Sequence, residues 1–417
     1  MQSLVKNFKA FVDSSPTSFH AAKNIAAHLK KSGFSELNEK KTFSLSYGKS
    51  YYIIRNGSII AFTLPKKEAK RAVIIGSHTD SPSFKLKPKF FNSDGIEQAS
   101  IEVYGGPHIP SFSAADLKIA GRLLVKTNNG IEEKLVDFDQ SPCVIANAPI
   151  HLDPSPNSEG FKLDPQTQVC PILGFSDGKK DWLSKQITNG TILSHDLFLV
   201  PCDPMRLLGI NGEIISSYRI DNLSSAFSSL IGITKATVKS DTIQMAVFWD
   251  HEEIGSGSEE GASSPFFLDT LQRICIKLDL TDEDFFCLKN NSFSLSLDAA
   301  HAFHPNYPSL YSKDHAPVLG KGTAIKMNAN KRYATSGPGI AKLIDMLKTK
   351  KIDHQIYVNH ASKKCGSTIG HIFASQTGIE TVDMGAPILG MHSVKEQMAT
   401  SDIISMCALC QSTFDLL

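Results

Sequence analysis

An apolar run that ends in a row of ionisable side chains is the feature that most constrains this chain. Residues 244–249 read QMAVFW, a pattern typical of a strand buried on both faces. The next four residues, DHEE at 250–253, are all ionisable. Glu252 and Glu253 could form a solvated surface patch, but such a patch need not follow an apolar strand directly. Neighbouring side chains at a strand exit point in different directions, so one glutamate can bind a metal ion while the other faces a substrate.

Further apolar runs predict a layered core around this strand. They are typical of buried strands at 72–76, 293–297 and 379–382. Helical patterns occur near 15–33, from Asp221 onward, near 338–348 and near 393–410. Because strands and helices alternate along these parts of the chain, we predict an α/β fold.

The middle of the chain has a different character. Residues 89–202 contain short alternating runs, many turn residues and a Pro-rich stretch, which together indicate a separate, mostly β insertion. The 417 residues also exceed the size at which a single core usually keeps growing. We therefore predict a mixed-sheet α/β sandwich domain made of residues 1–88 and 203–417, interrupted by an inserted β-rich domain at 89–202.

Histidines and carboxylates follow each predicted strand of the core, and strand ends lie near one another at the carboxyl edge of an α/β sheet. The side chains at or near these ends are His78, Asp80, Asp221, Asp250, His251, Glu252, Glu253, Asp298, His301, His304 and His392. Taken alone, Asp221 could be a helix N-cap and His392 a hydrogen-bonded structural histidine. The joint occurrence of so many histidines and carboxylates at strand ends is much less expected by chance than any single one of them. We therefore predict a site where these side chains converge.

The chemistry of this set favours a metal centre. A mixture of histidine and carboxylate suits Zn²⁺ or a similar divalent ion, whereas cysteine, the usual ligand of structural zinc, is absent from it. Two ions about 3.5–4 Å apart need one bridging carboxylate. Asp80 follows His78 by two residues, so it is expected either to hold the far ring nitrogen of a metal-bound His78 or to fix the adjacent loop.

Composition and local patterns argue against several other classes. The chain has 43 basic and 42 acidic side chains, a net charge of +1 that argues against a nucleic-acid partner. No apolar stretch approaches the roughly 20 residues needed to cross a bilayer, and the N-terminus lacks the apolar core of a signal peptide. We therefore predict a cytoplasmic protein without a membrane partner. Cys407 and Cys410 are expected to be buried, reduced thiols, since no second pair completes a zinc site. The GSGSEEG stretch at 255–261 lacks the lysine and the spacing of a phosphate-binding loop.

Seven motifs occur along the chain in this order: SHTDSPSFKLKP, RIDNL, FWDHEEIGS, SLDAAHAFHPNY, KGTAIKMNANKRYAT, CGSTIG and TVDMGAPILGMHS. Together they resemble the motifs of the aspartyl aminopeptidase family of dinuclear zinc exopeptidases, and the resemblance covers nearly the whole chain. It implies the following two ligand sets, with Asp221 as the bridge: His78, Asp221 and Asp298 for one zinc ion, and Asp221, Glu253 and His392 for the other. It also implies two zinc ions per subunit, with Mn²⁺ or Co²⁺ as substitutes.

The same resemblance implies roles for the residues around the metal. Glu252 would be the general base that takes the proton of a metal-bound water and passes it to the leaving amine. Asp80 would orient His78. His301 and Lys326 would lie near the substrate, where a cation and a histidine suit the carboxylate of an N-terminal Asp or Glu. Without the resemblance, Lys326 would be interpreted as an ordinary exposed lysine.

The resemblance further implies how the chain assembles. Peptides with a free N-terminus would be the substrates, and the inserted domain would serve as a lid and dimerisation domain. The subunits would form a dodecamer built from dimers, in which His151 reaches towards a neighbouring active site. Residues 110–117, PSFSAADL, depart from the family's Trp-Phe-Asp-Arg-Asp-Leu run, so the contacts of the lid are expected to differ.

The leading hypothesis is a dinuclear-metal aminopeptidase that prefers an acidic N-terminal residue. One alternative uses the same metal centre on another amide, as a neutral-preferring aminopeptidase or an N-acyl amino acid deacylase. A second alternative is an inactive assembly scaffold built on the peptidase fold. Against the scaffold, every proposed ligand and the proposed base are present in the chain.

Overall fold

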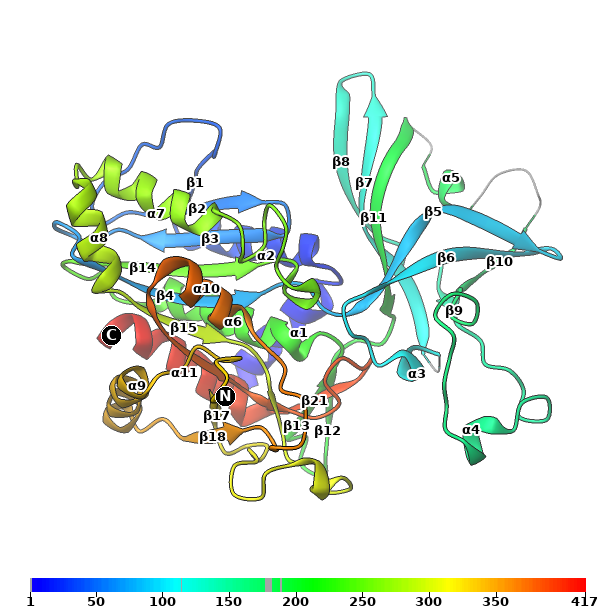
Figure 1. The fold of residues 1–417 in the computed structure, drawn as a ribbon. Helices are drawn as coiled ribbons and strands as arrows, with labels where there is room; N and C mark the ends of the chain where they lie inside the picture. Colours follow the sequence, from blue (N-terminus) through cyan, green and yellow to red (C-terminus); the bar gives the residue numbers. More distant parts are fainter. Residues whose placement is uncertain (1, 114, 177–181, 188–189) are drawn as a thin grey trace.

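The chain forms two parts, each built around its own β-sheet (Figure 1). The computed structural model describes residues 2–113, 115–176, 182–187 and 190–417. The first part combines a large sheet with most of the long helices, and the second part consists mainly of strands (Figure 1).

The first part contains a sheet that has nine strands among the described residues, in the order β1-β2-β3-β14-β4-β15-β19-β17-β18. Its strands are β1 (Ser35–Glu36), β2 (Ser50–Arg55), β3 (Ser58–Thr63), β4 (Arg71–His78), β14 (Thr242–Trp249), β15 (Phe293–Leu297), β17 (Thr323–Met327), β18 (His354–Val358) and β19 (Glu380–Gly385). The central strands β14, β4, β15 and β19 run parallel, whereas β3 lies antiparallel to β14 and β17 lies antiparallel to β19. The predicted mixed α/β sandwich and its four core strands are confirmed.

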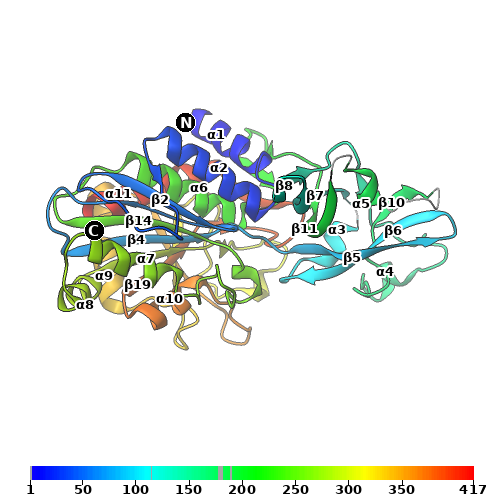
Figure 2. The same cartoon turned by 90° about the horizontal axis from the view of Figure 1, so that it is seen from above.

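Helices cover both faces of this sheet because each of its faces is apolar. One face packs against α1 (Gln2–Asp13), α2 (Ser18–Lys31), α6 (Ile220–Lys235), α9 (Gly337–Lys350) and α11 (Thr400–Leu416). The other packs against α7 (Phe266–Lys277), α8 (Asp282–Asn290) and α10 (Ile369–Thr377). Figure 2 shows α1 and α2 on one side of the sheet and α7 and α10 on the other.

The prediction of a helix near 393–410 was wrong for its first residues. Residues Glu396–Ala399 form strand β21, which pairs antiparallel with β13 (Ile214–Ser217), and α11 begins only at Thr400. Strand β13 also pairs with β12 (Arg206–Leu208). Pairing with a distant segment therefore overrides the local helical pattern at these residues.

The second part is a sheet that closes on itself. Its strands are β5 (Ser83–Ser93), β6 (Ile96–Tyr104), β7 (Asp116–Thr127), β8 (Gly130–Asp137), β9 (Cys143–Val144), β10 (Ile172–Phe175) and β11 (Thr191–Pro201). Their order is β11-β5-β6-β10-β9-β7-β8, and β11 also pairs with β7, which gives a barrel-like arrangement. Short helices α3 (Ile109–Phe112), α4 (Ser155–Ser158) and α5 (Trp182–Lys185) decorate it. The β-rich character of the insertion is confirmed, and the division into domains at 88/89 and 202/203 stays a prediction.

Two further expectations concern membranes and thiols. Among the described residues, none of the helices combines the length and the apolar character that a bilayer span requires.

Cys407 and Cys410 are buried free thiols on α11, which confirms the interpretation of the C-x-x-C pair as part of the core.

A close approach between two strands makes Gly385 a sensitive position. Asp298 follows β15, and its backbone amide donates to the carbonyl of Met384 at 2.9 Å. A Cβ at Gly385 would lie 1.7 Å from the carbonyl oxygen of Asp298, so no side chain fits unless the backbone moves. Glycine is required at the last residue of β19 because two backbones meet there.

We predict that Gly385→Ala lowers the free energy of unfolding by about 1–3 kcal/mol, because the added methyl group forces the Asp298 backbone away. Gly337→Ala is the control, since a Cβ at Gly337 meets nothing within 4 Å. Thermal unfolding of both variants checks this prediction. Equal midpoints for the two variants would contradict it.

Candidate metal centre

Most of the ionisable residues singled out at the strand ends lie together at the carboxyl edge of the central parallel strands. His304 instead packs edge-on against Tyr307, at 4.8 Å between ring centres. His78 is the last residue of β4, Asp298 follows β15, and Glu252–Ile254 form a short 3-10 turn after β14. Asp221 lies in the first turn of α6, and His392 lies in the loop between β20 (Pro387–Ile388) and β21. The parallel direction of the strands brings these groups together, because equivalent ends of parallel strands share one edge.

The side chains form two groups that share Asp221. In the first, Nε2 of His78 lies 3.4 Å from Oδ1 of Asp221 and 3.4 Å from Oδ1 of Asp298. In the second, Nε2 of His392 lies 3.4 Å from Oδ2 of Asp221 and 3.5 Å from Oε2 of Glu253. Each group has the residue types and the spacing that could hold a metal ion. Asp221 turns one oxygen to each histidine, which is the arrangement of a bridging carboxylate.

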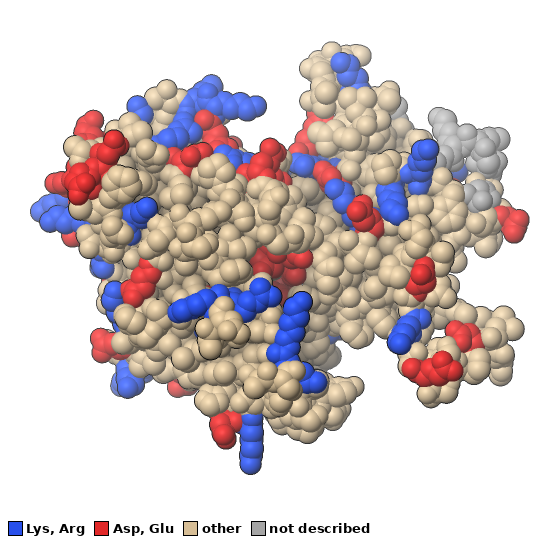
Figure 3. All heavy atoms as spheres, viewed as in Figure 1, with Lys and Arg blue, Asp and Glu red and all other residues tan. Residues whose placement is uncertain are grey.

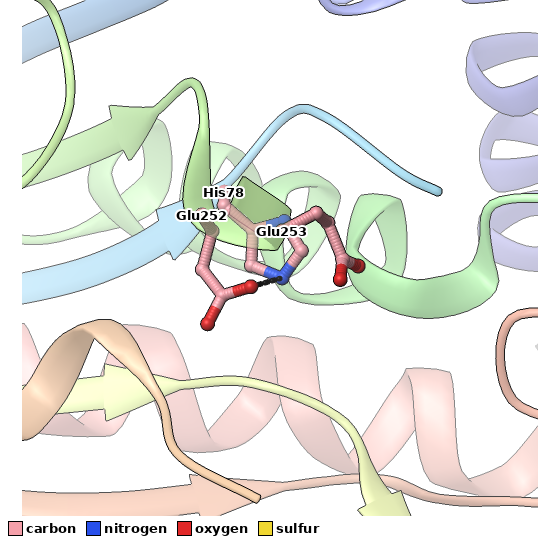
Figure 4. Close-up of side chains that lie close together, drawn as sticks. All are labelled: His78, Glu252 and Glu253. Carbon is pink, nitrogen blue, oxygen red and sulfur yellow. Dashed lines mark ion pairs between the residues drawn. The ribbon is translucent and has the colours of Figure 1, made fainter. Parts of the chain in front are cut away.

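The two adjacent glutamates have different surroundings. Glu253 belongs to the second group, whereas Oε2 of Glu252 lies 4.0 Å from Nε2 of His78 in the first group (Figure 4). Figure 4 shows the two carboxylates on different sides of the His78 ring. The turn at Glu252 therefore directs the side chains of these two consecutive residues to different sides of His78.

Backbone and side-chain oxygens fix the orientation of both histidines. Nδ1 of His78 lies 3.1 Å from the carbonyl oxygen of Asp80 and 3.3 Å from its Oδ1. Nδ1 of His392 lies 2.9 Å from the carbonyl oxygen of Gly106. In a neutral imidazole whose Nδ1 donates to an oxygen, Nε2 carries no proton and can bind a metal ion through its lone pair.

Asp80 contacts both the ring of His78 and the turn that follows β14. Besides contacting His78, its two carboxylate oxygens accept hydrogen bonds from the backbone amides of Glu252 and Glu253, each at 3.1 Å. The hydroxyl of Tyr104 donates to Oδ2 of Asp80 at 2.8 Å. One buried carboxylate therefore links the histidine of β4 to the turn that follows β14.

The second part of the molecule contributes a brace to this centre, formed by residues 104–108. Its contacts are the Tyr104 hydroxyl on Asp80, the Gly106 carbonyl on the His392 ring, and the His108 amide, which donates to the His392 carbonyl at 2.8 Å. A Cβ at Gly105 would lie 3.1 Å from Cβ of Glu253, which keeps this position small. Sequence reasoning missed these residues. Their only local signal is the glycine pair, which permits a close approach of backbone to a site.

The electrostatics of the cluster fit a bound cation. Oδ1 of Asp221 and Oε1 of Glu253 are buried and have no hydrogen-bond partner among the described residues. Burial, together with the nearby carboxylates of Asp298 and Asp80 and against the opposing effect of His78, raises the pKa of Glu252 to about 8. Burial also raises the pKa of Glu253 well above its ordinary value. Divalent ions would satisfy the free oxygens and reverse these shifts. On the face drawn in Figure 3, acidic side chains gather in the hollow between the two parts.

The predicted substrate residues lie in different places. Lys326, on β17, is 2% exposed, which excludes the ordinary exposed lysine. Its Nζ lies 3.3 Å from Oδ2 of Asp298 and 5.3 Å from the centre of the Tyr333 ring. His301, on the short strand β16 (Ala300–His301), packs edge-on against Tyr357 at 5.9 Å between ring centres. Lys326 therefore contacts Asp298 of the first group, and His301 follows Asp298 by three residues in the sequence.

Two other predictions concern the second part and its surroundings. His151 is exposed in the loop before α4. Helix α4 lies at the end of the second part that is away from the nine-stranded sheet (Figure 1). Within the divergent run 110–117, Ala114 lies outside the described residues. Phe112, the aromatic residue of that run, is fully buried against Phe84 and Tyr218.

Asp250 and His251 form hydrogen bonds around the end of β14. The amide of Asp250 donates to the hydroxyl of Ser58 at 2.7 Å, and Oδ1 of Asp250 accepts from the amide of His251 at 2.9 Å. Nδ1 of His251 lies 2.7 Å from Oγ of Ser258. These contacts fix the exit from β14 just before the two glutamates.

Comparison with known proteins identifies the family of this chain. A family model described as aminopeptidase I zinc metalloprotease (M18) matches residues 11–414. The chain belongs to the M18 family. It is a metallo-aminopeptidase, and zinc is the metal of its family.

Individual relatives match over nearly their full length. Aspartyl aminopeptidase 1 of Schizosaccharomyces pombe is 36% identical over 450 residues, which cover 99% of this chain and 95% of the relative. A chain in the cryo-EM structure of the Ape4 and Nbr1 complex is 36% identical with a TM-score of 0.94, covering 99% of this chain and 85% of that one. The structure of the Saccharomyces cerevisiae mApe1 dodecamer is 27% identical with a TM-score of 0.85, covering 98% of this chain and 95% of that one.

Proposed function

We propose that this M18 aminopeptidase is a dinuclear-metal enzyme that removes N-terminal Asp or Glu from peptides. The observation that carries the proposal is the shared position of Asp221, whose two carboxylate oxygens face two different histidines at 3.4 Å each. A single-metal site needs no such bridge, whereas two ions about 3.5–4 Å apart do.

The two groups assign the ligands. The first ion would be held by His78, Asp221 and Asp298, and the second by Asp221, Glu253 and His392. Zinc is proposed as the ion at both positions, with Mn²⁺ or Co²⁺ as substitutes. When bound, these ions lower the pKa of a water molecule and polarise the carbonyl of the scissile bond.

Glu252 is proposed as the general base. Its carboxylate lies beside the first group, and its side chain is 13% exposed, so it can reach a water molecule and the substrate. It would take a proton from the attacking water and pass it to the leaving amine. Asp80 would act through His78 and through the amides of both glutamates, as a residue that orients the site.

The preference for an acidic N-terminal residue rests on Lys326 and His301, together with the similarity to a relative named as an aspartyl aminopeptidase. The ammonium group of Lys326 is held inside the protein beside Asp298, where it adds positive charge next to the first ligand group. A buried cation attracts a substrate carboxylate strongly because water screens it little. A neutral-preferring aminopeptidase and an N-acyl amino acid deacylase are the alternatives on the same metal centre.

Assembly and location are proposed as follows. The similar mApe1 structure is a dodecamer. We propose a dodecamer built from dimers for this chain, with the insertion predicted at 89–202 as the lid and dimerisation domain. His151 is exposed, as a residue that contacts a neighbouring subunit's active site must be before assembly. A cytoplasmic location is proposed from the sequence alone.

Replacing the base tests the catalytic assignment. Glu252→Gln should lower kcat by about 10²–10⁴-fold, the usual contribution of a general base, while zinc still binds. Glu259→Gln is the matched control, because Glu259 lies in the same loop but is exposed. Steady-state kinetics and zinc content of both variants give the answer. Unchanged turnover in Glu252→Gln would rule out the assignment.

A panel of substrates tests the specificity. Peptides with N-terminal Asp or Glu should be cleaved about ten-fold or more faster than one with N-terminal Leu, because the buried lysine attracts the side-chain carboxylate. Acetylated Asp should not be cleaved, because it lacks the free amine of an aminopeptidase substrate. Each rate is measured with chelator and after adding back Zn²⁺, Mn²⁺ or Co²⁺. Faster cleavage of Leu would identify a neutral aminopeptidase, and cleavage of the acetyl group a deacylase. No turnover by the zinc-loaded protein on any substrate would favour the inactive scaffold.

A further inference from the structure

Glu396 is a buried carboxylate that contacts two of the proposed ligands through their backbones. It is the first residue of β21 and is 1% exposed. Its Oε2 accepts a hydrogen bond from the amide of Asp221 at 2.9 Å, and its Oε1 accepts one from the amide of His392 at 2.7 Å. One side chain therefore ties together two residues that are 171 positions apart (392 minus 221).

His392 needs such a partner because of its backbone conformation. Its φ is +68°, in the left-handed region that residues with a side chain rarely adopt. Backbone strain of this kind persists only when the surrounding structure holds it in place. The hydrogen bond from the His392 amide to Glu396 and the one from the His108 amide to the His392 carbonyl are two such restraints.

Glu396 is itself held firmly. In the pairing of β21 with β13, Glu396 lies opposite Ser217, four residues before Asp221. Met398, two residues further along β21, is fully buried in the core of the first part. The carboxylate therefore sits on a rigid strand beside the segment that leads to Asp221.

We propose that Glu396 is a positioning residue of the metal centre, which sets the separation of Asp221 and His392 by accepting one backbone amide from each. This inference rests on the proposed metal centre and deepens it. It requires a carboxylate, because both oxygens must accept a hydrogen bond. In a glutamine, the amide nitrogen would face a backbone N–H, so one of the two bonds would be lost.

The chain contains a matched control. Asp402, in the first turn of α11, is fully buried, and its carboxylate accepts the amides of Gly320 at 2.8 Å and Gly322 at 3.1 Å. It makes the same two bonds as Glu396, but to residues outside the ligand groups. Asp402→Asn therefore removes one comparable buried hydrogen bond and lowers the stability of the fold, but it leaves the contacts of Asp221 and His392 unchanged.

The experiment compares the zinc affinity of the full-length protein with those of Glu396→Gln and Asp402→Asn. Metal-free samples are titrated with Zn²⁺ by calorimetry in the presence of a competing chelator, and thermal unfolding is recorded alongside. Both variants should unfold at a lower temperature than the unchanged protein. Only Glu396→Gln should bind zinc about ten-fold or more weakly, the usual effect of removing a residue that orients ligands. Its turnover should rise again as zinc is raised, which loss of fold alone would not allow.

A second variant covers the case in which Glu396→Gln does not fold. Glu396→Asp keeps the charge but shortens the reach, so it cannot hold both amides, and it should also weaken zinc binding while Asp402→Asn does not. Unchanged zinc affinity in the Glu396 variants, or an equal loss in Asp402→Asn, would overturn the inference and leave the metal centre standing. No zinc binding by the unchanged protein would overturn the metal centre and the inference with it.

Discussion

Negative charge buried at the carboxyl edge of the parallel strands is the constraint on which the rest of the structure depends. Carboxylates converge there with few basic side chains to balance them, and Oδ1 of Asp221 and Oε1 of Glu253 have no hydrogen-bond partner among the described residues. Removing such charges from water is costly unless cations or hydrogen bonds compensate. The apolar strands hold these groups in place through the packing of the core, so the fold supplies the rigidity and a metal ion would supply the charge.

The centre depends on both parts of the molecule. The β-rich part begins at Ser83, only a few residues after His78 and Asp80, and its residues 104–108 return to contact Asp80 and His392. The ring of Tyr104 in turn packs edge-on against Phe198 of β11, at 5.4 Å between ring centres. The orientation of both histidines is thus fixed by oxygens outside the two proposed ligand groups, an arrangement that is usual in metal sites.

The sequence predicted the strands and their ionisable ends because both signals are local. A buried parallel strand is a continuous apolar run, and a carboxylate directly after it stands out. Glu396 and residues 104–108 were missed because their roles depend on contacts across the chain. Glu396 was placed in a helix by its local pattern, whereas pairing with β13 makes it part of a strand. The burial of Lys326 could not be predicted from the local sequence either, because its partner Asp298 follows a different strand.

The central claim is that two metal ions share Asp221. Crystals of the zinc-loaded protein, measured on both sides of the zinc absorption edge, test it most directly. The account predicts two anomalous peaks per chain, one beside His78 and Asp298 and one beside Glu253 and His392, with Asp221 between them. A single peak at this site, or two peaks that do not share Asp221, would contradict it.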